Sequence, residues 1–581
     1  MAKNKRRRSA APGGAPQPSP GTPGPGATLG RLPAVEEILS GRRGLRLVLL
    51  AVLTTLCLAP FVGKAFHIDD PLFLWAGKQI QAHPGNPYGF AVNWYGITLP
   101  MAEVTKNPPL TSYYIAAVAA VAGWSERSLH LAFLLPAIVA ILGTYLLAER
   151  MCRRPLLATL CTLFTPAFIV SSTNVMSDTL TLALWVAAIY LWMVGLERRS
   201  WILLTLSGIS IALCSVAKYF GMSLIPLLFL YSVIRERRVG WATAYLLVPV
   251  VLLGAYQWAT HELYGRGLLM DAASYATGAR TGWSKWSFEK LLIGLGFTGG
   301  CMGAAWGFAL WSWKPKALLA GAAAAIVVIL VVANTRMVGS HGLGGGEQNV
   351  AATAVLLGLF VAGGLGILGL AARALLARKD PEEVLLALWI IGTFLFAAMV
   401  NWSTNARSIL PLVPAAAILM MRGMDRQRKA PGIGPMATVL AVAAVVAMGV
   451  GWADCEFANS ARRAARVIHN KYGGRPGGLW FEGHWGFQYY MEALGGKAID
   501  SNTSQLFPGD IIVVPENNTN VSPPPEERTR LLEVLEVPSS RWIATMTRGA
   551  GLYSDAFGLL PFTVGDIPPE RYKVFEGKLP Q

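Results

Sequence analysis

Long apolar stretches recur along most of this chain, and they constrain its fold more than any other feature. About thirteen of them approach the roughly 20 residues that a helix needs to cross a bilayer. The composition agrees, because 53% of the residues are hydrophobic and only 14% are charged, whereas soluble proteins average about 25% charged residues. The sequence therefore predicts a polytopic all-α membrane domain. The stretches are Leu45–Phe66, Leu129–Met151, Leu156–Ser172, Val175–Leu196, Trp201–Ala217, Phe220–Ile234, Val239–Thr260, Leu291–Trp311, Ala317–Asn334, Val350–Leu376, Val384–Val400, Ile409–Met421 and Met436–Trp452.

Basic residues gather in the short segments between alternate stretches. If the N-terminus is cytoplasmic, every segment that returns to the cytoplasm is basic, from Arg150–Arg154 to Arg422–Lys429, and the outside segments are longer and less basic. This asymmetry is the positive-inside pattern of membrane proteins. The net charge of +17 therefore reports topology and does not indicate nucleic-acid binding. The six cysteines are scattered, so they predict neither a disulfide framework nor a metal site.

The chain divides into three predicted parts. Residues 1–43 form a basic, Pro/Gly-rich cytoplasmic segment that we expect to be disordered. Residues 44–453 form the membrane domain, whose outside loop 64–128 carries an acidic motif. Residues 454–581 form a small extracytoplasmic α/β domain, called the tail below. Its expected elements are helices over Ala458–Tyr472 and Glu526–Leu535 and strands over Leu479–Phe481 and Asp510–Val514.

Two adjacent acids, Asp69 and Asp70, stand just past the end of the first apolar stretch. Charge at a membrane boundary is costly and so indicates function, and two carboxylates can bind a divalent metal or accept a proton from a hydroxyl. Asp70 and Pro71 also suit the N-cap and first residue of a helix over Pro71–Ala82. We therefore favour a capping role for Asp70 and a catalytic or metal-binding role for Asp69.

Five short motifs follow one another along the membrane domain. They are His67-Ile68-Asp69-Asp70-Pro71-Leu72, Asn107-Pro108-Pro109-Leu110 before Tyr113-Tyr114, Ser177-Asp178-Thr179-Leu180, Ala217-Lys218-Tyr219-Phe220-Gly221, and Asn405-Ala406-Arg407-Ser408. Their order and spacing over roughly residues 45–420 resemble the GT-C superfamily of membrane glycosyltransferases, and more closely the branch that holds the protein O-mannosyltransferases and lipid A aminoarabinose transferases. Two positions depart from that pattern: Asn107 replaces a common His or Lys, and Ser408 replaces a frequent aromatic residue.

The resemblance implies a reaction outside the membrane, in which a sugar passes from a polyprenyl-phosphate donor to an acceptor lipid, glycan or protein. It also implies a multi-pass protein of a bacterial plasma membrane. The departing phosphate needs charge neutralisation, and the acceptor hydroxyl needs a base. The implied catalytic residues are Asp69, Asp70 and Asp178, with Asp69 as base or as ligand of a divalent metal whose identity stays open. The implied substrate-binding residues are Lys218, Tyr219, Arg407, Tyr113, Tyr114 and Asn107.

Each of these residues also has a structural interpretation. Asp178 could cap a helix, Lys218 could extend to the membrane interface, and Arg407 could anchor a span there. The tyrosines could belong to an aromatic belt. His67 is a minor candidate metal ligand beside Asp69.

The aromatic tail segment Trp480–Tyr490 could stack on the sugar rings of an acceptor, although core packing is the favoured interpretation. The Gly-rich segment Gly339–Gly346 lacks the Lys-Ser/Thr of a phosphate-binding loop. The alternative functions for the whole chain are a transporter or flippase of a lipid or glycan, and a non-catalytic scaffold. A transporter would place its charges near the bilayer midplane within repeated halves, and no repeat is visible here.

Overall fold

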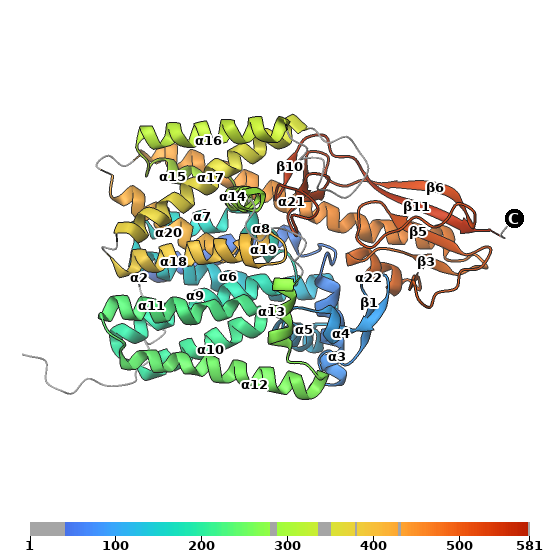
Figure 1. Ribbon diagram of the computed structural model, residues 1–581, viewed down its shortest axis with the longest axis horizontal. Coiled ribbons are helices and arrows are strands. Elements are labelled where there is room, and N and C mark those ends of the chain that lie inside the picture. The colour runs from blue at the N-terminus through green and yellow to red at the C-terminus, as the bar shows by residue number, and fades with distance from the viewer. Residues whose placement is uncertain (1–40, 279–287, 335–349, 378–379, 428–430, 579–581) are drawn as a thin grey trace, which may run out of the picture.

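The computed structural model describes residues 41–278, 288–334, 350–377, 380–427 and 431–578. Almost all of the predicted disordered segment 1–43 and the whole segment Gly339–Gly346 lie outside the described residues. The described chain forms a bundle of helices with a smaller domain built around a sheet at one end (Figure 1). The bundle helices are α2 (Gly41–Leu58), η1 (Ala59–Phe61), α6 (Glu126–Met151), α7 (Pro155–Leu163), α8 (Pro166–Ser172), α9 (Ser177–Arg198), α10 (Trp201–Ala217), η2 (Tyr219–Ser223), α11 (Leu224–Glu236), η3 (Trp241–Leu246), α12 (Leu247–Tyr264), α14 (Phe288–Met302), η4 (Gly303–Trp306), α15 (Gly307–Leu310), α16 (Pro315–Asn334), α17 (Val350–Ala377), α18 (Pro381–Leu395), η6 (Phe396–Val400), α19 (Ala406–Ile409), α20 (Leu412–Asp425) and α21 (Ile433–Tyr472).

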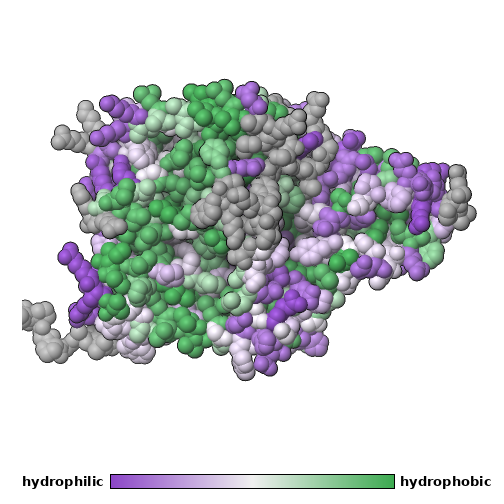
Figure 2. Space-filling view, viewed as in Figure 1, coloured by the Kyte–Doolittle hydropathy of each residue, from purple (hydrophilic) through white to green (hydrophobic). Residues whose placement is uncertain are grey.

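Ten helical segments among the described residues are long and apolar enough to cross a membrane, or eleven if the bent pair α7 and α8 counts as one span. Helix α10 is apolar but shorter, and α20 does not reach that length. All thirteen predicted stretches are therefore mainly helical, but a count of thirteen spans is not confirmed. Figure 2 shows apolar side chains covering the bundle and hydrophilic ones gathering on the tail and at the opposite end of the bundle. The chain is an integral, multi-pass membrane protein.

Close backbone approach holds part of the bundle together. A Cβ on Gly299 of α14 would lie 1.9 Å from the carbonyl oxygen of Phe360 in α17, and one on Gly364 of α17 would lie 2.3 Å from that of Leu295 in α14. Only glycine fits at both positions. Small residues at helix contacts are the usual basis of packing in membranes, where lipid is as apolar as the side chains.

The tail is an α/β domain, as the sequence predicted. Its five-stranded sheet has the order β4-β3-β5-β11-β6, in which β3 is parallel to β4 and β5 and β11 is antiparallel to β5 and β6. Helix α22 and the last turns of α21 pack on the sheet through residues such as Ile468, Phe487 and Val513. The tail elements are β3 (Leu479–Phe481), α22 (Trp485–Ala493), β4 (Lys497–Ala498), β5 (Ile511–Pro515), β6 (Thr529–Val537), β7 (Ile543–Ala544), β8 (Met546–Thr547), β9 (Ala550–Gly551), β10 (Thr563–Val564) and β11 (Glu570–Gly577).

One of the elements predicted for the tail is wrong, and another is part of a longer helix. The expected helix over Glu526–Leu535 is instead strand β6, which pairs along its whole length with β11. Cross-strand pairing overrides the helix preference of its Leu and Glu residues. The expected helix over Ala458–Tyr472 is the end of α21, a single 40-residue helix that runs from the last apolar stretch into the tail.

The outside loop forms a layer at the end of the bundle that carries the tail (Figure 1). The predicted helix over Pro71–Ala82 is confirmed as α3 (Asp70–Ala82). The layer also holds the hairpin of β1 (Ala91–Asn93) and β2 (Thr98–Pro100), together with α4 (Met101–Val104), α5 (Leu110–Ala122) and, from a later loop, α13 (Leu268–Gly278).

Candidate functional site

A strained turn separates Asp69 and Asp70 from the first span. Ile68 has a φ of 45°, which is rare for a β-branched residue and indicates a conformation that the surrounding fold imposes. Asp69 then occupies the N-cap position of α3, although its side chain makes no capping hydrogen bond, and Asp70 is the first helical residue. The expected capping role of Asp70 is therefore wrong, because the cap position is one residue earlier.

The Asp70 carboxylate instead joins two segments of the backbone. It accepts hydrogen bonds from the backbone N–H of His67 at 2.8 Å and from that of Val175 at 3.0 Å. Complete burial raises the pKa of Asp70 to about 7, against the opposing effects of Lys64 and the two N–H donors. Asp70 thus fixes the acidic motif against the segment that leads into α9, and its position is that of a structural residue.

Asp69 forms an ion pair with Arg407 on α19. Its Oδ2 lies 2.7 Å from Nη1 of Arg407, and the two side chains are 22% and 15% exposed. The guanidinium also lies 5.6 Å from the ring centre of Tyr553, and its Nε finds no hydrogen-bond partner among the described residues. The tail holds this arrangement in place, because the backbone N–H of Ala406 donates to the carbonyl of Leu552 at 2.8 Å. The structure therefore brings two predicted site residues together.

Asp178 and Lys218 form a second ion pair beside the first. Nζ of Lys218 lies 2.6 Å from Oδ1 of Asp178, whose side chain is buried in the first turn of α9. Burial by itself lowers the pKa of the Arg407 guanidinium, but the negative charges of Asp69 and Asp178 outweigh this effect, so the pKa is raised. Lys218 therefore points to a carboxylate rather than to the membrane surface. Nη1 of Arg407 also lies 3.2 Å from Sδ of Met176, two residues before Asp178, so the two ion pairs are neighbours, and we call their four residues the charged cluster.

A fully buried polar network connects the first and last spans, and the sequence analysis missed it. Nζ of Lys64 lies 2.5 Å from Oδ2 of Asp454, and neither side chain is exposed. Lys64 also donates to Asn174 at 2.5 Å, while Asp454 accepts from Tyr553 at 2.9 Å and from Thr545 at 2.8 Å. The sequence signal that could have revealed this network is the charged residue Lys64 at the end of the first apolar stretch. This network ties the tail to the segment that precedes the charged cluster.

His67 lies against the same network. Its Nε2 is 3.8 Å from Oδ1 of Asp454 and has no hydrogen-bond partner among the described residues. Burial lowers the pKa of His67 to about 3, so the imidazole is neutral. The part of the chain that the structure describes contains no group of three or more His, Cys, Asp or Glu side chains that could hold a metal ion. A preformed ligand set around Asp69 and His67 is therefore not seen there.

The remaining predicted substrate residues are engaged elsewhere. The hydroxyls of Tyr113 and Tyr114 donate to the carbonyls of Pro84 and Ala132. The Tyr219 hydroxyl lies 2.9 Å from that of Tyr256, and the backbone carbonyl of Asn107 accepts from the Tyr88 hydroxyl. Lys106, which precedes Asn107, pairs with Asp271 on α13 at 2.6 Å.

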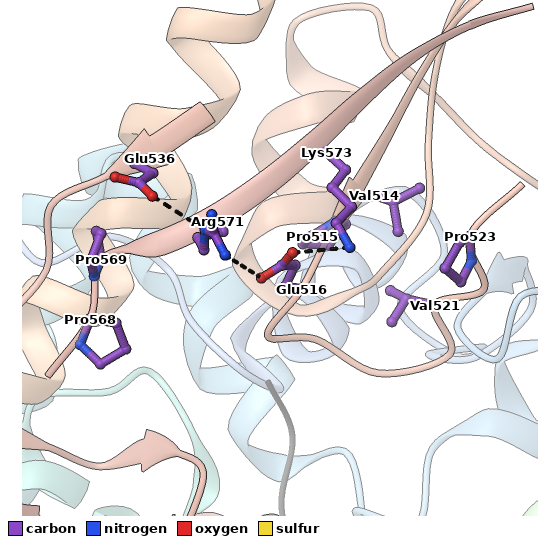
Figure 3. Close-up of a pocket in the computed structure, with 10 residues that line it drawn as sticks. All are labelled: Val514, Pro515, Glu516, Val521, Pro523, Glu536, Pro568, Pro569, Arg571 and Lys573. Carbon is purple, nitrogen blue, oxygen red and sulfur yellow. Dashed lines mark ion pairs between the residues drawn. The ribbon is translucent and has the colours of Figure 1, made fainter. Parts of the chain in front are cut away.

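One sizeable cavity lies away from the charged cluster. It has a volume of about 600 Å³ and opens on the tail sheet near Pro515 and Pro568. Figure 3 shows that its charged side chains face one another: Lys573 and Arg571 lie 3.1 and 3.9 Å from Glu516, and Arg571 lies 3.3 Å from Glu536. This cavity is lined by tail residues alone, so it contains none of the predicted site residues.

Comparison with known proteins confirms the predicted resemblance. Residues 106–261 match the family model of the dolichyl-phosphate-mannose-protein mannosyltransferases, and this segment includes Asp178 and Lys218. The chain therefore resembles the GT-C membrane glycosyltransferases. No curated protein matches it.

Solved structures with some likeness to the chain have low identity. ArnT from Cupriavidus metallidurans bound to undecaprenyl phosphate is 15% identical, with a TM-score of 0.40 over 81% of this chain and 92% of that one. Its apo state is 14% identical, with a TM-score of 0.41 over 82% and 93% of the two chains. The arabinofuranosyltransferase AftD from Mycobacteria is 13% identical, with a TM-score of 0.38 over 92% of this chain and 42% of that one.

Proposed function

We propose that this chain is a glycosyltransferase that moves a sugar from a polyprenyl-phosphate donor to a lipid, glycan or protein acceptor at the outer face of a bacterial plasma membrane. The observation that carries the proposal is the charged cluster, in which two carboxylate–cation pairs meet at helix ends beneath the tail. The family match over residues 106–261 supports the same reaction class.

The pairing suggests how the cluster works. A donor phosphate that enters the cluster competes with Asp69 for the Arg407 guanidinium, which suits two-pronged contact with phosphate. Asp69 is then released to accept the proton of the acceptor hydroxyl. The acceptor oxygen forms a bond to the anomeric carbon as the bond from that carbon to the phosphate oxygen breaks. The polyprenyl phosphate leaves with the electron pair, and Arg407 and Lys218 stabilise its added negative charge.

The two cations also bear on the metal prediction. A divalent metal at Asp69 would have to displace Arg407, which lies 2.7 Å from the carboxylate. Mg²⁺ would then be held by Asp69 together with oxygens of the donor phosphate, because Mg²⁺ commonly binds one or two carboxylates plus substrate phosphates. We propose that Arg407 and Lys218 supply the positive charge that the reaction requires.

Reconstitution tests the proposal. The purified chain in lipid vesicles is incubated with a panel of polyprenyl-phosphate hexoses and pentoses and with bacterial envelope lipids and glycans as acceptors. We expect release of free polyprenyl phosphate with at least one donor, lost in Asp69→Asn and retained in Asp566→Asn, since Asp566 is exposed. Movement of an intact donor or glycan across the vesicle membrane, without release of phosphate, would instead establish the transporter alternative.

A further inference from the structure

A tyrosine from the tail, Tyr553, lies against Arg407 of the charged cluster. The guanidinium carbon of Arg407 stands over the tyrosine ring, 5.6 Å from the ring centre. Tyr553 is 2% exposed, so its ring is shielded from water. A guanidinium over the face of an aromatic ring is attracted by the ring electrons, and the attraction is stronger where water is excluded. Tyr553 is therefore placed to control the position of Arg407.

Backbone hydrogen bonds hold the chain on both sides of Tyr553. The carbonyl of Leu552 accepts from the N–H of Ala406 at 2.8 Å, and the N–H of Asp555 donates to the carbonyl of Thr404 at 2.9 Å. The Asp555 carboxylate also accepts from the N–H of Thr404 at 3.1 Å. These bonds tie the tail directly to the start of α19, the helix that carries the arginine of the charged cluster.

The hydroxyl holds the far end of the Tyr553 side chain. It donates to Oδ2 of Asp454 at 2.9 Å and accepts from Nδ2 of Asn174 at 2.8 Å. The ring lies nearly perpendicular to that of His67, at 82°, with the two ring centres 5.3 Å apart. Buried groups whose hydrogen bonds are satisfied are rigid. The orientation of the ring is therefore set by the fold itself.

The polar contacts that the structure describes for the Arg407 guanidinium use one nitrogen atom. Its ion pair with Asp69 at 2.7 Å and its contact with the sulfur of Met176 at 3.2 Å are both made by Nη1. Nε has no hydrogen-bond partner among the described residues. Contacts through a single nitrogen leave the guanidinium able to turn about that atom. The attraction to the Tyr553 ring adds a second point of restraint.

We propose that Tyr553 is a positioning residue, whose ring holds the guanidinium of Arg407 in place while Arg407 exchanges Asp69 for the donor phosphate; the inference rests on the proposed transfer reaction. The exchange breaks the ion pair that anchors Arg407. The attraction to the ring persists, because it acts on the guanidinium charge and needs no oxygen acceptor. A group that is already held loses less freedom on binding, so the donor binds more tightly. The tail is thereby part of the donor site.

Graded changes of the ring test this role in the full-length protein. Tyr553→Phe and its mono-, di- and trifluorinated analogues keep the ring while fluorine withdraws electrons from its face, and Tyr553→Leu removes the ring. Native mass spectrometry measures binding of polyprenyl phosphate, and titration in the transfer assay measures donor and acceptor KM. We expect near-wild-type binding in Tyr553→Phe, weaker binding with each added fluorine, and a loss of about 5–30-fold in Tyr553→Leu. The acceptor KM should not change.

Tyr231 on α11 provides a matched control. It is also buried, its ring centre lies 5.9 Å from the guanidinium carbon of Arg235, and its hydroxyl accepts from the same arginine at 2.6 Å. The same series of changes at Tyr231 should leave binding of polyprenyl phosphate unchanged. In the Arg407→Ala background, Tyr553→Leu should have little further effect, because the ring then has no guanidinium to position.

The outcomes separate this inference from the proposed function. Binding of polyprenyl phosphate that does not respond to fluorination would overturn the positioning role, as would an equal loss from Tyr553→Leu in the wild-type and Arg407→Ala backgrounds. The fluorinated series decides the matter if Tyr553→Leu does not fold. Binding that depends on the ring, without transfer of any sugar, would overturn the reaction and support the positioning role. A chain that neither binds polyprenyl phosphate nor transfers a sugar would overturn both.

Discussion

At the residue scale, two neighbouring aspartates have different surroundings. Asp70 is buried and accepts two backbone hydrogen bonds, whereas Asp69 is partly exposed and pairs with Arg407. The strained backbone of Ile68 precedes both. A carboxylate that pairs with one exchangeable cation can take part in chemistry, and one whose oxygens hold backbone segments together cannot do so without loosening the fold.

Asp69→Asn should abolish transfer while the protein still folds. The amide keeps the shape of the side chain but cannot accept a proton, and loss of a general base typically lowers kcat by about 10²–10⁴-fold. Polyprenyl-phosphate release, together with thermal unfolding in detergent, measures both properties. Turnover near that of the wild type would remove Asp69 from the mechanism.

Arg407→Ala and Lys218→Ala should weaken donor binding. A hydrogen bond to a charged group contributes about 1.5–3 kcal/mol, so donor KM should rise about 10–100-fold, and kcat falls as well if the departing phosphate loses its cation. Arg407→Lys should recover part of the function, because lysine cannot make a two-pronged contact. Donor titration at saturating acceptor measures this, with exposed Arg541→Ala as control. Unchanged donor kinetics in both alanine variants would place the phosphate elsewhere.

Asp454→Asn should strongly destabilise the protein, because it leaves the Lys64 charge buried without a counter-ion. Removing one partner of a buried pair costs about 3–5 kcal/mol. The double variant Lys64→Met/Asp454→Asn should regain much of the lost stability, because no charge stays buried. Thermal unfolding in detergent compares them, with Lys471→Met as the surface control. A double variant no more stable than Asp454→Asn would show that the pair is not the source of the effect.

At the scale of elements, helix α21 and strand β11 determine how the tail is held. Helix α21 carries Asp454 into the buried network and then packs on the sheet. Strand β11 lies inside the sheet, between β5 and the edge strand β6, and begins with the buried residue Glu570. The Glu570 carboxyl receives hydrogen bonds from Asn517 alone among the contacts described, at 3.2 and 3.3 Å.

Glu570 should make the tail less stable as the pH rises. Burial raises the pKa of this carboxyl to about 8, from 4.5 when it is exposed. Between these values the folded state keeps a proton that the unfolded state has released. Its contribution to stability is therefore complete below pH 4.5 and is lost as the pH rises toward 8, by at most about 1.4 kcal/mol per pH unit.

Thermal unfolding of the wild type and of Glu570→Gln from pH 5 to pH 8 measures this contribution. We expect the difference in Tm to move in favour of Glu570→Gln as the pH rises, since the amide has no proton to lose. Glu536→Gln is the control, because its side chain is 57% exposed. Parallel curves for the wild type and Glu570→Gln would contradict the assignment.

At the scale of the whole molecule, the charged cluster lies where the bundle, the outside loop and the tail meet. The bundle supplies Asp178, Lys218 and Arg407, the loop supplies Asp69, and the tail places Tyr553 against Arg407. The tail must therefore lie on the same side of the membrane as the acidic loop.

Cysteine labelling in intact cells should place the tail outside and the predicted basic loops inside. In a variant without the native cysteines, Gln505→Cys in the tail should react with a membrane-impermeant maleimide. Val239→Cys, which is 68% exposed at the predicted cytoplasmic end of the stretch Val239–Thr260, should react only after permeabilisation. We expect this labelling pattern because basic loops of membrane proteins stay in the cytoplasm. The opposite labelling pattern would move the acidic loop and its chemistry to the cytoplasm.

The sequence by itself determined the features that local chemistry controls. Apolar stretches of about 20 residues predict helices because the backbone must satisfy its own hydrogen bonds in lipid. Helix α3 follows from Asp70-Pro71 and apolar spacing, and β3 and β5 follow from short apolar runs. The motifs around Asp69, Asp178, Lys218 and Arg407 named the members of the charged cluster.

Only the tertiary structure decided how those members pair. Asp69 meets Arg407 across 338 residues of sequence, and Lys64 meets Asp454 across 390. Such contacts depend on how the helices pack, and no local periodicity encodes them. The same holds for β6, whose pairing with β11 overrides its helix preference. The chemistry of the side chains is local, and their arrangement is a property of the whole fold.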